Sequence, residues 1–72
     1  MRLYLTFGTT YGALRAEALL QAAAIPCAVV PKPPAIRGAC GLAVRLTCAD
    51  APRALKALGA AHHAPRQSVT LD

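Results

Sequence analysis

Apolar and polar residues alternate at the start of the chain, over Arg2–Phe7, with the period of two expected for a half-buried strand. The turn Gly8-Thr9-Thr10 follows, and a threonine hydroxyl there is suited to cap a helix. The apolar spacing then becomes helical, and we expect a helix over Tyr11–Ala24. The predicted buried stripe of this helix is Ala13, Ala16, Leu20 and Ala23.

Proline residues mark the middle of the chain. Pro26 prevents the helix from continuing, and a second strand is expected over Cys27–Val30. The proline-rich segment Pro31–Ala39 suits neither a helix nor a regular strand, so it is predicted to be a loop. A third strand is expected over Gly41–Cys48. The side chains expected on its buried face are Leu42, Val44, Leu46 and Cys48.

The last third of the chain predicts a short helix and a final strand. Asp50 is a suitable N-cap residue, and the helix is expected over Arg53–Leu58. Gly59 is the expected C-terminal stop, and the last strand is expected over Gln67–Leu71. The inward side chains of this helix are predicted to be Ala54, Leu55 and Leu58.

The order strand, helix, strand, strand, helix, strand predicts an α+β fold of the ferredoxin-like βαββαβ kind. Such a fold has a four-stranded antiparallel sheet in the order 4-1-3-2 with both helices on one face. We expect residues 1–72 to form one domain. Much of the apolar content is alanine, so the core should be thin, and a homodimer could supplement it.

This topology brings three loops to one end of the sheet: those after the first strand, between the second and third strands, and before the fourth. The residues in these loops whose side chains are able to take part in catalysis or binding are Thr9, Thr10, Lys32, Arg37, Cys40, His62 and His63. Candidate groups from three separate segments are therefore expected to converge there.

Cys40 is the main candidate in this group. It lies between the proline-rich loop and the third strand, with Gly38 and Gly41 close on either side to allow a sharp turn. The N-terminus of the first helix and the charge of Arg37 would favour a thiolate there. The alternative is a small, buried and protonated thiol. Cys27 and Cys48 fall at the other end of the sheet, where we interpret both as core side chains.

Composition narrows the classes of function. The net charge is +5, but the eight Lys and Arg residues are dispersed, which favours ordinary solvated surface over a nucleic-acid site. Neither a signal peptide nor a membrane helix is predicted, and three cysteines do not suggest a disulfide framework, so we expect a cytoplasmic protein with reduced thiols. His62 and His63 lack the spacing of a known zinc motif, and no metal or other cofactor is expected.

Several features together resemble the small family of selenium/sulfur carrier-like proteins. The resemblance covers roughly Leu3 to Val69, and Cys40-Gly41-Leu42-Ala43 is its most specific part. The other matching features are Phe7, Thr9-Thr10, Ala13, Glu17, Leu20, Ile25-Pro26, Pro31, Pro33 and Arg45. The resemblance implies that Cys40 carries sulfur or selenium, as a persulfide or a selenenyl sulfide.

The leading hypothesis is thus a carrier rather than an enzyme, with a cysteine desulfurase or another donor and an acceptor protein as partners. Thr9, Thr10, Arg37 and Gly41 are the expected supporting residues. The alternatives are a small ligand-binding or dimerising regulatory module and a thiol redox sensor. A closed, apolar environment around Cys40 with a pocket elsewhere would favour the regulatory module.

Overall fold

The computed structural model describes residues 1–38 and 41–71 of the chain. All the predicted helices and strands occur in the predicted order. They are β1 (Arg2–Thr6), α1 (Thr10–Ala22), β2 (Ala28–Pro31), β3 (Leu42–Thr47), the 3-10 turn η1 (Cys48–Asp50), α2 (Ala51–Ala60) and β4 (Gln67–Leu71). Among the described residues, no helix is long and apolar enough to cross a membrane.

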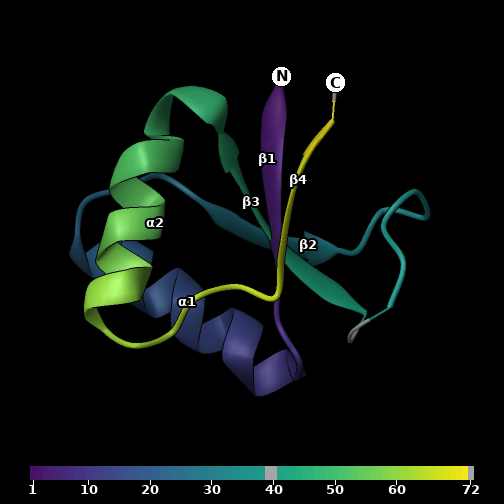
Figure 1. Cartoon of the computed structure of the whole chain (residues 1–72), viewed down its shortest axis with the longest axis horizontal. Coiled ribbons are helices and arrows are strands. Elements are labelled where there is room, and N and C mark those ends of the chain that lie inside the picture. Colours follow the sequence, from purple (N-terminus) through teal and green to yellow (C-terminus); the bar gives the residue numbers. More distant parts are fainter. Residues whose placement is uncertain (39–40, 72) are drawn as a thin grey trace.

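The four strands form one antiparallel sheet in the order β2-β3-β1-β4. The central strand β1 pairs with β3 on one side and with β4 on the other. Figure 1 shows α1 and α2 on the same side of the sheet. The predicted α+β class, with four antiparallel strands and two helices, is confirmed.

The main core lies between the helices and one face of the sheet. The apolar face predicted for β1 is confirmed, because Leu3 and Leu5 are buried together with Phe7 just beyond the strand, but Thr6 on the other face is buried as well. Alanine side chains on α1 and α2 let the helices lie close to the sheet. The rest of this core consists of Ala13, Ala16, Leu20, Ile25, Val44, Leu46, Ala54 and Leu58.

The opposite face of the sheet is also covered near one end. Thr6 and Ala43 are Cα partners on β1 and β3, and both are fully buried although they face away from the helices. Ile36, in the proline-rich loop, is only 3% exposed. Figure 1 shows this loop on the side of the sheet away from the helices. The loop is therefore a packed segment, anchored by Ile36.

Polar contacts fasten this loop and the edge strand. The Lys32 ammonium donates a hydrogen bond to the Ile36 carbonyl, and the Lys32 amide donates to the Gly41 carbonyl at 2.7 Å. On the other side of the sheet, the Val29 amide in β2 donates to Glu17 Oε2 at 3.3 Å. Glu17 thereby ties α1 to the edge of the sheet.

The two helix ends differ from the prediction. Helix α1 ends at Ala22, and Ala23, predicted to be buried, is exposed. Ala24 takes a positive φ of 60°, which lets the Ile25 amide donate to the Leu20 carbonyl. This Schellman arrangement turns Ile25, rather than Ala23, into the core. Both helices end in this way.

Gly59 was expected to stop α2, but the helix continues through it to Ala60. His62 instead adopts the left-handed conformation, with φ of 55°, and the His63 amide donates to the Leu58 carbonyl at 2.8 Å. A non-glycine residue thus supplies the turn. The terminating hydrogen bonds compensate for the cost of its positive φ.

Helix α2 also differs at its start and in its buried face. Asp50 occupies the N-cap position, but its carboxylate makes no capping bond and accepts from Arg53 and from Thr47 instead. The pKa of Asp50 is lowered, mainly by the hydrogen bond from Arg53 and to a smaller extent by the hydrogen bond from Thr47. Leu55, predicted to point inward, is 40% exposed, because only Ala54 and Leu58, four residues apart, share the buried stripe.

Candidate functional site

The strand pairings place the three loops with candidate residues at one end of the sheet. Thr6 at the end of β1 is the Cα partner of both Ala43 and Gln67, and Pro31 at the end of β2 is the partner of Leu42. The segments after β1, between β2 and β3, and before β4 therefore leave the sheet at the same end of its strands. Cys40 itself lies outside the described residues.

The first of these segments starts α1. A threonine N-cap was predicted in this turn, and Thr9 is that residue: its Oγ1 accepts a hydrogen bond from the Gly12 amide at 2.9 Å, and the helix begins one residue earlier than expected. Thr10 is the first helical residue and is exposed. The first turn of α1 contains no acidic residue. The positive end of this helix dipole is therefore not neutralised by its own side chains.

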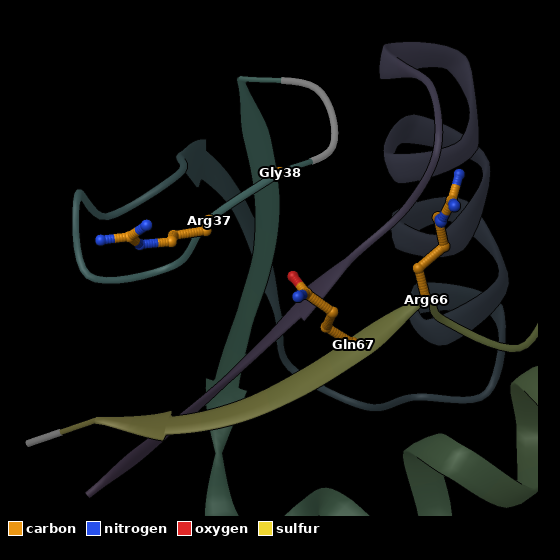
Figure 2. A pocket seen from close by; sticks show the side chains of 4 residues that line it. All are labelled: Arg37, Gly38, Arg66 and Gln67. Atoms are coloured by element: carbon orange, nitrogen blue, oxygen red, sulfur yellow. The ribbon is translucent and has the colours of Figure 1, made fainter.

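The proline-rich loop approaches this end through Arg37 and Gly38. Gly38 has a φ of 79°, a conformation that glycine adopts without strain. Arg37 is exposed, and Figure 2 shows its side chain directed away from Arg66 and Gln67. Gly41 lies in open surroundings, since no described atom would contact a Cβ there. The expected support from Arg37 and Gly41 is therefore not visible as a contact among the described residues.

A hollow of about 360 Å³ lies between the loop and the start of β4. It is lined by Arg37, Gly38, Arg66 and Gln67 (Figure 2). Gln67 Oε1 accepts a hydrogen bond from the Thr6 hydroxyl at 3.1 Å, which fixes one wall. The hollow opens at the same end of the sheet as the loops.

Arg66 is the residue that the sequence analysis missed at this end. A Cβ added to Gly8 would lie 3.1 Å from Arg66 Nη1, so the guanidinium extends over the turn that leads into α1. The Arg66 amide also donates to the Thr6 carbonyl at 2.8 Å. The position of Arg66 directly before the last strand, at the predicted convergent end, was the signal that could have identified it.

His63 has a structural contact, whereas its neighbour His62 is exposed. The His63 ring stacks on Phe7, with 5.1 Å between ring centroids and 10° between planes. Its Nε2 donates to the Gly12 carbonyl at 2.8 Å, which places the neutral ring in the Nε2–H tautomer. His63 thus fastens the end of α2 to the start of α1.

Replacing His63 with alanine should lower the free energy of unfolding by about 1–3 kcal/mol, because both the ring packing and the hydrogen bond are lost. His62→Asn is the matched control, since asparagine tolerates the left-handed conformation, and its effect should stay within about 0.5 kcal/mol. Urea unfolding of the two variants measures this difference. Equal losses would contradict the structural role of the His63 ring.

The two other cysteines lie at the opposite end of the sheet, as predicted. Cys27 precedes β2 and Cys48 belongs to η1 rather than to β3. Both thiols are free and half-buried, and both pack against the main core without being fully enclosed in it. The Cys27 thiol donates a hydrogen bond to the backbone carbonyl of Glu17. The pKa of Cys27 is raised, mainly by burial and to a smaller extent by the negative charge of the Glu17 carboxylate. Cys27 is therefore a poor nucleophile near neutral pH.

Within residues 1–38 and 41–71, no group of three or more His, Cys, Asp or Glu side chains could hold a metal ion. The acidic residues described there are few, and both are engaged: Glu17 with β2 and Asp50 with Arg53. The end of the sheet where the three loops meet thus has arginine side chains, a helix N-terminus and backbone amides. Such an arrangement favours an anionic group.

Comparison with known protein families matches residues 2–69 to the family described as putative Se/S carrier protein-like. The match spans nearly the whole chain of 72 residues and includes every helix and strand except the end of β4. No curated protein and no solved structure matches the chain.

Proposed function

Because the chain belongs to the Se/S carrier-like family, we propose that it holds a sulfur or selenium atom on Cys40 and passes that atom to an acceptor. The family match over residues 2–69 is the observation that carries this proposal. Cys40 is the thiol in the segment Cys40-Gly41-Leu42-Ala43, which the sequence resemblance singles out. The loaded forms are a persulfide or a selenenyl sulfide.

The described surroundings of this segment support a reactive anion. Gly38 and Gly41 stand on either side of Cys40 in the sequence, and Gly38 borders the hollow that Arg66 also lines. Arg66 adds a positive charge beside the N-terminus of α1, whose first turn has no acidic residue. Positive charges and helix N-termini lower the pKa of a thiol and increase the thiolate fraction available for transfer.

The proposed loading step is a thiol–persulfide exchange. The Cys40 thiolate attacks the outer sulfur of a donor persulfide, a new S–S bond forms, and the bond to the donor sulfur breaks. The donor leaves as a thiolate and takes a proton from solvent, so that the sulfane sulfur moves without net oxidation or reduction. Transfer to the acceptor repeats the step in reverse, and selenium follows the same course from a selenium-bearing donor. The residues need no cofactor for this exchange.

The proposed setting and partners follow from this chemistry. We infer a ferredoxin-like carrier domain, since the strand order β2-β3-β1-β4 reads 4-1-3-2 from the β4 edge. The free thiols of Cys27 and Cys48 are compatible with a reducing cytoplasm. A cysteine desulfurase is the proposed class of sulfur donor, and the acceptor is a second protein.

Intact-mass measurement after incubation with a cysteine desulfurase and cysteine tests the proposal. The expected result is a reductant-sensitive mass increase of one sulfur atom, and peptide mapping should place it on Cys40. Omitting cysteine is the control and should give no adduct. An absent adduct, or one located only on Cys27 or Cys48, would contradict the proposed function.

A further inference from the structure

A second hollow lies at the end of the sheet opposite to the proposed carrier site. It has a volume of about 240 Å³. Its lining residues are Arg2, Pro26, Cys27, Ala28, Arg45, Leu46 and Thr47. We refer to it as the Arg2–Arg45 hollow.

Strand register explains how two arginines come to border one hollow. Arg2 is the Cα partner of Thr47, and Arg45 is the partner of Ala28, so these four residues lie on the face of the sheet away from the helices. Arg2 and Arg45 are therefore diagonal neighbours on adjacent strands, a separation of about 7–8 Å that long side chains can bridge. Ala28 and Thr47 are small, which leaves space between the two longer side chains.

The charge of Arg45 is not balanced within the described part of the chain. Arg45 is half-buried, whereas the other described arginines are exposed. The ion pair found among the described residues joins Arg53 to Asp50, and no described hydrogen bond uses the Arg45 guanidinium. The Thr47 hydroxyl does donate to Asp50 Oδ2 at 3.1 Å, but that carboxylate is already bound by Arg53 at 3.0 Å.

We propose that the Arg2–Arg45 hollow binds a small tetrahedral oxyanion with two negative charges, such as sulfate or phosphate. Arg2 and Arg45 both line one hollow, so their like charges repel each other, and a dianion bound there would remove that repulsion. The planar fork of each arginine can donate two hydrogen bonds to such an ion. A single carboxylate would neutralise only one of the two charges. This site is separate from the proposed carrier site and does not depend on it.

Titration of the ¹⁵N-labelled protein with sodium sulfate, with ionic strength held constant by sodium chloride, tests the site. The amides of Arg2, Ala28, Arg45 and Thr47 should shift saturably, while chloride alone should leave them in place. Acetate should bind at least about tenfold more weakly, because it carries one charge. Unsaturable shifts, or equal affinity for acetate, would overturn the assignment.

Matched variants identify the residues that hold the ion. Arg45→Gln and Arg2→Gln should each weaken sulfate binding about tenfold or more, because each removes one charged fork. Arg45→Lys keeps the charge but loses the fork, so intermediate affinity is expected, and it serves as the second variant if Arg45→Gln does not fold. Arg15→Gln changes an exposed arginine of α1 and should bind as the unmodified chain does. Unchanged affinity in both Arg2→Gln and Arg45→Lys would refute the site, as would shifts centred on the N-terminus of α1.

Discussion

Replacement of Cys40 with serine is expected to abolish loading with sulfur or selenium completely, while the chain remains folded. A serine hydroxyl has nearly the size of the thiol but cannot form a persulfide or a selenenyl sulfide. The sequence places Cys40 at the expected junction between the proline-rich loop and the third strand, so the free energy of unfolding should change by no more than about 1 kcal/mol. Intact mass after donor treatment measures the first effect, and thermal unfolding measures the second.

Cys27→Ser and Cys48→Ser are the controls, and both should still load. Cys48 packs against the main core, so an unpaired hydroxyl there should cost about 1–3 kcal/mol of stability. Stability loss and loading loss are thus expected in different variants. If Cys40→Ser unfolded the protein and Cys48→Ser lost the adduct, the roles assigned to these two cysteines would be reversed.

Leu58→Ala should destabilise the fold by about 2–5 kcal/mol, the cost of a cavity at a fully buried leucine. Leu58 belongs to the core between α2 and the sheet, and its carbonyl also accepts the bond that ends the helix. In a domain of this size, each kcal/mol lowers Tm by about 4–8 °C. The loss should therefore be large in calorimetry or in urea unfolding.

Leu55→Ala provides the matched control on the same helix. Leu55 is 40% exposed, so truncation should change stability by about 0.5 kcal/mol or less, helped by the high helix propensity of alanine. The two variants remove the same atoms at positions three residues apart. Comparable losses in both would mean that α2 packs with a different face toward the sheet.

The sequence was informative about the fold where periodicity was clear. The alternation in β1 and the proline residues after α1 placed the strands and helices in the correct order. The errors in the buried faces and C-terminal ends of the helices concern Ala23, Leu55 and Gly59, which lie in alanine-rich helices or directly after one. Alanine fits buried and exposed faces equally well, so the apolar stripe was poorly defined, and the two Schellman ends depend on tertiary contacts of Ile25 and His63 that no local pattern specifies.

The sequence predicted at which end of the sheet the candidate site lies, but it predicted only some of the residues there. Topology alone brought the three loops together, and one of the two threonines expected to offer a capping hydroxyl, Thr9, is the N-cap. Arg66 was missed because its importance comes from lying over Gly8, a contact across 58 positions of the sequence that only the folded chain reveals. His63 was considered for chemistry, but its ring is engaged with Phe7 and Gly12.

The hydrogen bond from the Val29 amide to the Glu17 carboxylate protects the β2 edge of the sheet from pairing with strands of other molecules. Edge strands with free amides are templates on which a foreign strand can add and start aggregation. In β2 the Val29 amide is occupied by the Glu17 carboxylate, and Pro31 has no amide hydrogen to offer. Growth of the sheet is therefore hindered at β2, which leaves β4 as the edge open to strand addition.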